Sequence, residues 1–250
     1  MSGHSKWKTI QHKKGAADAK RGKIFSKMAK EFMVVARQGG SDPNTNAALR
    51  NLIQKAKSVN MPTDNIDRAI KKGAGELEGA TYHEIMYEGY AGGGVAMIVM
   101  VLTDNKNRSA AEIRHIFTKH GSDFAGQGSV LRGFTRKGQI FVDSSAVDED
   151  KLMALVLEAG AEDMQNDDGQ YEILTDPSSF ADVMQAMEKA GIPTQGGEVA
   201  MVPLNYVPVA NKAIAQAVLK FVADLEDHDD VQNVYTNMNV DPAIMKEIQG

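Results

Sequence analysis

The apolar residues in the first part of the chain recur at the spacing of an α-helix. A helix is predicted from about residue 16 to residue 37, and Gly39-Gly40 then supplies a typical C-terminal stop. With about 100° between successive residues, one face of this helix carries Ile24, Phe25, Met28, Phe32 and Val35. The opposite face carries Lys20, Lys23, Lys27 and Lys30.

Two further helices are predicted before residue 76. Pro43 is expected to open the second, which ends before Asn60-Met61-Pro62, and Thr63 is expected to cap the third, which Gly73 stops. Their inward positions are Leu49, Leu52, Ile53, Ala56, Ile66, Ala69 and Ile70. Three helices with short links predict a small bundle, and the glycine-rich residues 73–80 read as a linker.

From residue 82 onward the pattern alternates between strands and helices. Strands are predicted at 82–88, 95–103 and 129–134, with a helix at about 108–120. The next segments, at 139–143, 149–159, 162–166, 171–175, 178–190 and 198–202, spell β-α-β-β-α-β, the order of a ferredoxin-like unit. Asp167-Asp168-Gly169 is the expected hairpin turn at its centre.

A helix at 211–224 and a strand at 233–239 would complete the first of these two sets. The predicted fold class is therefore α+β: a three-helix bundle followed by two ferredoxin-like α/β domains, the third inserted in the second. The expected domains are a basic helical domain at 1–76, a discontinuous α/β domain at 77–137 plus 206–245, and an inserted α/β domain at 138–205.

Composition narrows the class of protein. A hydrophobic content of 42% in 250 residues is enough for real cores. With no cysteine, the chain has no disulfide, no thiol nucleophile and no cysteine-ligated metal. The longest apolar run, 95–102, is far shorter than a membrane span of roughly 20 residues, and no apolar segment follows the basic N-terminus as in a secretory signal. A cytoplasmic protein that does not contact membrane is expected.

Charge is segregated along the chain. Residues 1–75 carry 16 Lys and Arg against 5 Asp and Glu, a formal +11. Residues 76–139 carry 7 of each sign, and residues 140–250 carry 5 against 21, a formal −16. So basic a segment repels itself unless a polyanion lies near it, and nucleic acid is the commonest such partner.

The basic segment 1–75, here called the basic head, contains the candidate nucleic-acid-binding residues. They are Lys6, Trp7, Lys8, Lys13, Lys14, Lys20, Arg21, Lys23, Lys27 and Lys30. Lysine outnumbers arginine there, which favours contact with phosphates over reading of base edges. Trp7, the only tryptophan, suits stacking on an unpaired base. Its alternative is packing of residues 2–15, here called the arm, onto the bundle, and the alternative for the lysines is a solvated surface.

The remaining motifs favour structural roles. Gly92-Gly93-Gly94 precedes a strand rather than a helix, so it predicts a hairpin turn and not a phosphate-binding loop. The segment 104–108 begins like a calcium loop but lacks its acidic twelfth position. The acidic run 224–230 reads as a solvated turn rather than a metal site. No catalytic motif is found, so no enzyme activity, cofactor or metal is expected.

Several segments together resemble the YebC family. They are Gly3-His4-Ser5-Lys6-Trp7 and the segments 18–25, 60–73, 87–90, 102–108, 114–115 and 128–130. The resemblance spans the whole chain and is most specific before residue 135. This chain differs from many relatives at Ala91-Gly92-Gly93-Gly94, where a Gly-Pro-Gly-Gly-like turn is usual, and at Phe124-Ala125-Gly126.

The resemblance implies a helical N-terminal domain, two α/β domains and no catalytic residues. The family is described as probable transcriptional regulators that bind DNA, while mitochondrial relatives are translational activators and bacterial relatives are linked to ribosomes.

The leading hypothesis is therefore a non-enzymatic nucleic-acid-binding regulator of gene expression, partnered by DNA. The first alternative is a ribosome-associated translation factor that binds ribosomal RNA. The second is a protein-interaction scaffold whose basic head docks onto its own acidic tail or onto a partner protein. An enzyme that uses carboxylates of the acidic half is the least favoured.

Overall fold

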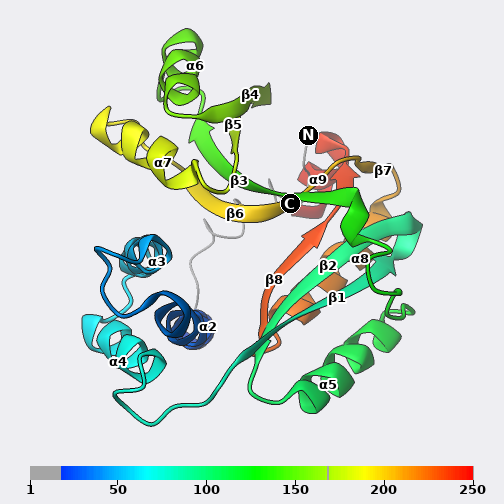
Figure 1. Cartoon of the computed structure of the whole chain (residues 1–250). Coiled ribbons are helices and arrows are strands. Elements are labelled where there is room, and N and C mark those ends of the chain that lie inside the picture. The colour runs from blue at the N-terminus through cyan, green and yellow to red at the C-terminus, as the bar shows by residue number, and fades with distance from the viewer. Residues whose placement is uncertain (1–17, 168, 250) are drawn as a thin grey trace. The chain divides into compact units, whose positions relative to one another are not determined.

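The computed structural model describes residues 18–167 and 169–249 (Figure 1). They form two compact units. One comprises the described residues up to Ser129 together with Asn211–Val234, and the other comprises Val130–Ala210 and the described residues from Tyr235 on. The predicted α+β class is confirmed, with a helical N-terminal part followed by antiparallel sheets that carry helices.

The N-terminal part consists of α2 (Asp18–Gly39), α3 (Ala47–Ser58) and α4 (Thr63–Gly73). The three helices lie against one another (Figure 1). Their apolar faces meet in one core, as the periodicity predicts. Phe32 and Leu49 are fully buried at its centre, and Ile24, at the edge, remains 37% exposed. The buried members of this core are Met28, Phe32, Leu49, Leu52, Ala56, Met61, Ile66 and Ala69.

Two predicted helix starts are wrong. The second helix begins at Ala47, four positions after Pro43, because Asn46 is its N-cap. The Asn46 side chain accepts from the N–H of Leu49 and donates to the carbonyls of Val35 and Gly40, so it also ties α3 to the end of α2. The third helix begins at Thr63 itself, with Pro62 at the cap position and no side-chain cap bond.

The first sheet has the strand order β1-β2-β8, in which β8 is Val231–Thr236. The antiparallel pair β1 (His83–Ala91) and β2 (Val95–Thr103) is joined by the 3-10 turn η1 (Gly92–Gly94), which confirms the predicted hairpin. Gly93 and Gly94 have φ values of 76° and 75°, a region that glycine enters without strain. Helices α5 (Lys106–Lys119) and α8 (Lys212–Glu226) meet where Phe117 and Phe221 pack edge to face at 4.9 Å.

The strand predicted at 129–134 is wrong. Residues 127–130 form a turn and η2 (Leu131–Gly133) follows, so β3 (Phe134–Asp143) begins only at the last predicted position. The turn is held by the N–H of Gly128, which donates to the buried carboxylate of Glu88 at 2.6 Å. Gly128 also has a φ of 79°, which does not fit an extended strand.

The second unit contains a complete β-α-β-β-α-β set. After β3 come α6 (Glu149–Glu158), β4 (Ala161–Asp167), β5 (Gln170–Thr175), α7 (Phe180–Lys189) and β6 (Gly196–Pro203). The antiparallel order β4-β5-β3-β6 is that of a ferredoxin-like sheet. Its core includes Ile140, Val142, Leu152, Val156, Ile173, Val183 and Met187.

The C-terminal segment is more divided than predicted. In place of one strand at 233–239 there are β8 (Val231–Thr236) and β9 (Met238–Val240), and β9 pairs in parallel with β7 (Val207–Val209). Helix α9 (Pro242–Gln249) ends the described chain. The division into three domains, with the third inserted at 138–205, stays a prediction. None of the described helices is long and apolar enough to cross a bilayer.

A close contact between α2 and α4 yields the first testable prediction. A Cβ at Gly73 would lie 2.5 Å from the carbonyl oxygen of Met33 and 2.8 Å from its Cα. Gly73→Ala is therefore expected to push α4 off α2 and cost about 1–3 kcal/mol of unfolding free energy, measured by urea denaturation followed by circular dichroism.

The matched control is Gly22→Ala on the outside of α2, where nothing lies within 4 Å of the added Cβ. This change is expected to stabilise by about 0.5–1 kcal/mol, because alanine loses less backbone entropy in a helix. Equal effects of the two substitutions would contradict the packing described here.

Candidate nucleic-acid interface

The ten predicted nucleic-acid-binding residues fall into three groups. Lys6, Trp7, Lys8, Lys13 and Lys14 lie outside the described residues. Lys20 and Arg21 lie in the first turn of α2, and the Arg21 side chain is exposed. Lys23, Lys27 and Lys30 follow along one face of α2 and are half-buried rather than open to solvent.

These three lysines all bind one segment, residues 226–230 at the C-terminal end of α8, here called the acidic loop. The Lys23 ammonium donates to the Asp227 carboxylate at 2.6 Å and to the Asp227 carbonyl at 3.0 Å. Lys27 donates to the carbonyl of Glu226 at 2.5 Å. Lys30 donates to the Asp230 carboxylate at 2.6 Å and to the Asp229 carbonyl at 3.0 Å.

The end of α8 explains why cations gather there. The last carbonyls of a helix lack partners within it and carry the negative end of the helix dipole. Glu226 and Asp227 form the last residue and the C-cap of α8, and their carbonyls accept from Lys27 and Lys23. Burial lowers the pKa of Lys27, and the charges of Glu226 and Asp229 only partly offset that effect.

Asp230 is the point where this contact meets the first sheet. Its carboxylate is 5% exposed, and each oxygen has its own set of donors. Oδ1 accepts from Lys30, whereas Oδ2 accepts from Arg108 at 2.8 Å and from Ser109 at 2.7 Å. The Asp230 carbonyl also accepts from the N–H of Leu102 at 2.8 Å, which fixes the loop to β2.

The hydrogen bonds of Asp230 set its protonation state. Burial alone would raise the pKa of this carboxyl, but donation from Lys30, Arg108 and Ser109 outweighs burial and holds the pKa well below its usual range. Asp230 therefore stays ionised at pH values where an exposed aspartate is already protonated. The cluster of Asp230 with its donors Lys30, Arg108 and Ser109 is here called the buried node. It was not predicted from the sequence, where 224–230 suggested a solvated turn.

The segment that resembles a calcium loop has a structural role. Asn105 caps α5 by accepting from the N–H of Arg108, and Arg108 bridges Asp104 and Asp230 at 2.9 and 2.8 Å.

Glu112, His228 and Asp230 bring metal-ligating atoms within 4.8 Å of one another. Their partners already account for this geometry. The N–H of Asp230 donates to Nδ1 of His228 at 3.1 Å, so Nε2 carries the imidazole proton and donates to Glu112 at 2.9 Å.

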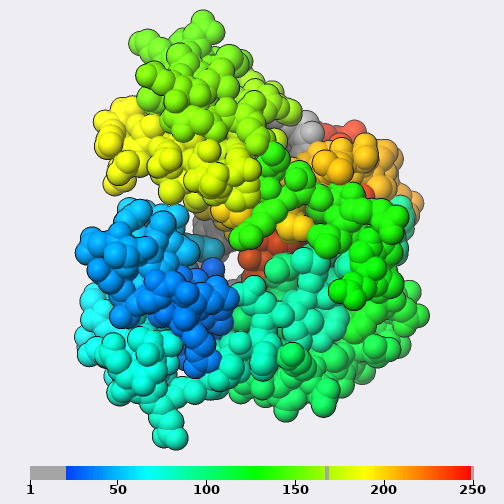
Figure 2. All heavy atoms as spheres, in the orientation of Figure 1, coloured from blue at the N-terminus to red at the C-terminus, as the bar shows by residue number. Residues whose placement is uncertain are grey.

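A second basic surface, on α3, was missed in the sequence. Arg50, Lys55 and Lys57 are exposed, and no acidic residue occurs between Asp42 and Asp64. That gap is the signal that would have revealed it. Arg50 and Lys57 are two turns apart and lie on one exposed face of α3, whereas Leu49 and Leu52 are buried. Figure 2 shows α2, α3 and α4, in blue and cyan, as one continuous surface.

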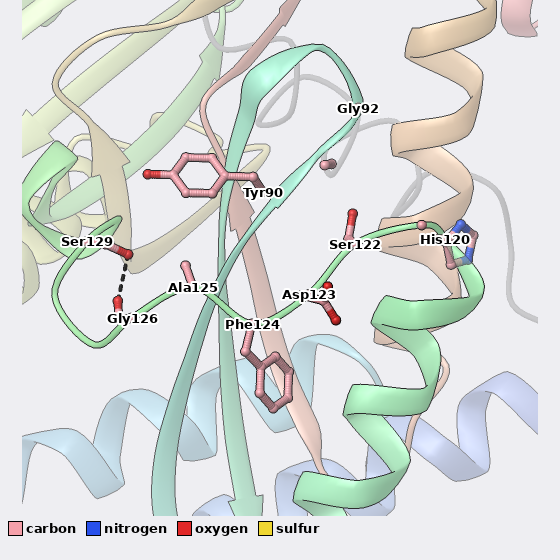
Figure 3. A pocket seen from close by; sticks show the side chains of 11 residues that line it. Tyr90, Gly92, His120, Ser122, Asp123, Phe124, Ala125, Gly126 and Ser129 are labelled. Atoms are coloured by element: carbon pink, nitrogen blue, oxygen red, sulfur yellow. Dashed lines mark hydrogen bonds between the residues drawn. The ribbon is translucent and has the colours of Figure 1, made fainter.

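Two hollows lie in the first unit. One, of about 870 Å3, is lined by Lys23, Lys30, Arg108, His115 and residues 227–230, so cations and anions share its walls. The other, of about 590 Å3, lies between Tyr90 and the loop 120–126 (Figure 3). There His120 stacks on Phe221 and bonds Asp224 at 2.9 Å, and within the described residues no hydrogen bond links it to Ser122.

Substituting the buried node tests its role. Asp230→Asn is expected to cost about 2–4 kcal/mol of unfolding free energy at neutral pH, because Lys30 and Arg108 lose their charged partner. The control is Asp227→Asn, whose carboxylate is 72% exposed and which is expected to cost under about 0.5 kcal/mol. Denaturant unfolding measures both.

The same comparison has a defined pH dependence. Because the folded-state pKa of Asp230 is lowered, its contribution is complete above the unfolded-state pKa of about 3.9 and is lost as pH falls below that value. The stability difference between the wild type and Asp230→Asn should therefore shrink below about pH 4. A difference that grows on acidification would contradict the assignment.

The comparisons with known proteins cover nearly the whole chain. Residues 5–76 match the TACO1/YebC protein N-terminal domain, and residues 82–238 match the TACO1/YebC second and third domain. A probable transcriptional regulatory protein of Geobacter sulfurreducens is 52% identical over 99% of this chain and 100% of its own. One from Halothermothrix orenii is 52% identical over 99% of both chains.

A solved structure shares the fold. The crystal structure of a conserved hypothetical protein from Aquifex aeolicus superposes with a TM-score of 0.80 at 45% identity, over 90% of this chain and 92% of that one. Fold, domain matches and full-length relatives agree with the motifs found in the sequence. The chain belongs to the TACO1/YebC family.

Proposed function

We propose that the protein is a non-enzymatic, nucleic-acid-binding regulator of gene expression whose basic helical domain holds the phosphates. The observation that carries the proposal is the segregation of charge, +11 over residues 1–75 against −16 over residues 140–250. In this proposal the arm, the lysine face of α2 and the exposed cations of α3 contact the nucleic acid. The names of the relatives support a role in transcription.

The chemistry of the proposed surface fits a polyphosphate of either kind. Lysine ammonium groups neutralise phosphates without reading base edges, so DNA at a promoter and ribosomal RNA satisfy them equally. Transcriptional control through DNA is the function proposed here. A ribosome-associated role in translation is the alternative, and the acidic α/β domains would then contact ribosomal or other proteins.

One observation favours the scaffold alternative. Lys23, Lys27 and Lys30 bind the chain's own acidic loop, so part of the basic face has an internal partner. The exposed side chains of Arg50, Lys55 and Lys57 support nucleic-acid binding nonetheless, because they add cations outside that contact.

Crosslinking in living cells, followed by sequencing of both the attached DNA and the attached RNA, tests the function. Enrichment of promoter fragments supports the transcriptional proposal, and enrichment of ribosomal RNA selects the translational alternative. If neither DNA nor RNA is recovered above the level of an untagged control, the result supports the scaffold alternative.

Binding in vitro should depend steeply on salt. If about six cations reach phosphates together, log K against log salt should fall with a slope of roughly −4 on single strands and −5 on duplex. Replacing Lys20, Lys23 and Lys27 by glutamine should weaken binding to all sequences alike and make the slope shallower by about 1 for each phosphate that is no longer neutralised. Fluorescence anisotropy over a salt series measures both.

The matched control removes three lysines from the acidic half, as Lys151→Gln, Lys189→Gln and Lys246→Gln. Its net charge equals that of the first variant, so overall charge alone would weaken both equally. Equal affinities and slopes for the two variants would show that the basic head is not the binding surface.

A further inference from the structure

We propose that the acidic loop is a built-in competitor of nucleic acid, which occupies Lys23, Lys27 and Lys30 until a polyanion displaces it. This inference rests on the proposed function and adds its regulation. It starts from the fact that the lysines predicted to hold phosphates already hold anionic oxygens of the chain itself.

The loop offers the lysines the same kind of partner as a phosphodiester. An ammonium group has three N–H donors, and carboxylate, carbonyl and phosphate oxygens all accept at similar distances. Lys23 and Lys30 each place two donors on the loop, one on a carboxylate and one on a carbonyl. A phosphate cannot accept from these N–H groups while they donate to the loop. The loop and the phosphate therefore exclude each other.

The loop is anchored independently of the lysines. Oδ2 of Asp230 stays bound to Arg108, Ser109 and Thr103, and its carbonyl stays bound to Leu102. Only Oδ1 is committed to Lys30. Opening therefore breaks the contact between α2 and the loop and leaves the loop in place on the first sheet.

The chain also provides a place to hinge. Residues 74–81, between α4 and β1, are all exposed and belong to no helix or strand. On one side of this linker, the core of the helical domain is built from α2, α3, α4 and Met61 just before α4, so that domain can move as a unit. The linker thus lets α2 leave the loop without unfolding either part.

The contacts of Lys23 and Lys27 are the readily replaced ones, whereas the Lys30–Asp230 pair is buried, at 16% and 5% exposed. In the Lys23–Asp227 pair the half-buried lysine is 40% exposed and the aspartate 72%, and pairs this accessible to solvent contribute little to stability. Lys27 is bound through a carbonyl and has its pKa lowered by burial, so its charge is better accommodated beside a solvated phosphate. The apparent affinity for nucleic acid is then the affinity of the open state, in which α2 has left the loop, multiplied by the fraction of molecules in that state.

The test neutralises the loop and leaves its anchor intact, as Glu226→Gln, Asp227→Asn and Asp229→Asn in the full-length protein. The probe is a fluorescein-labelled oligothymidylate, titrated at fixed salt. The expected result is roughly tenfold tighter binding than wild type, the size of effect that follows when about one molecule in ten is open.

The matched control removes three exposed acids from elsewhere in the same unit, as Glu78→Gln, Glu84→Gln and Asp123→Asn. Net charge changes equally, so the control should bind within about twofold of wild type. If the loop variant and the control variant bind with equal affinity, the proposal that the loop competes with nucleic acid is wrong, and the proposed function is unaffected. Absence of binding by all three proteins would overturn both.

A second readout follows the loop directly. The chain has no cysteine, so Asp229→Cys carries a single spin label at the loop. Adding the oligothymidylate should increase the mobility of the label, because α2 leaves it. An unchanged spectrum at saturating probe would overturn the proposal whatever the affinities are.

Discussion

The first unit depends on the hydrogen bonds that the carboxylate of Asp230 accepts. It is buried where α2, α5, β2 and the end of α8 come together, and it has donors from three of them. Such a buried charge is costly unless it is hydrogen-bonded, and Oδ2 keeps its donors Thr103, Arg108 and Ser109 whether or not Lys30 is bound at Oδ1. That requirement fixes the position of Arg108 and Ser109 at the start of α5, and it brings Lys30 of α2 to within 2.6 Å. The first turn of α5, the end of β2 and the contact with α2 therefore all meet at one group.

The elements that the sequence predicted well are those whose signal is local. The apolar stripe of α2 and the glycines around it define a helix and its end, and the core of Phe32, Leu49 and Ile66 follows from periodicity alone. The hairpin at Gly92–Gly94 and the β-α-β-β-α-β order likewise depend on neighbours in the chain. Each of these features is determined within one or two turns of backbone.

The features that were missed depend on distant partners. A run of small and apolar residues at 129–134 suggests a strand, but the carboxylate of Glu88, forty positions earlier, holds Gly128 in a turn. The lysine face and the acidic run were both visible, yet their contact spans about two hundred residues, and only the folded chain shows which charges meet. Ion pairs between residues so far apart leave no periodic pattern in the sequence, so they could not be predicted from it.

The exposed linker at 74–81 has a consequence for which anions the lysines can meet. Because it tethers α2 to the loop in one chain, the loop acts at an effective concentration in roughly the millimolar range for a short flexible connection. A lone phosphate or mononucleotide at lower concentration loses to such a neighbour. A polymer that presents several phosphates in a row gains from multivalency and overcomes it. In the proposed competition the tether therefore acts as a length filter, which favours nucleic acid over the small phosphorylated metabolites of a cell.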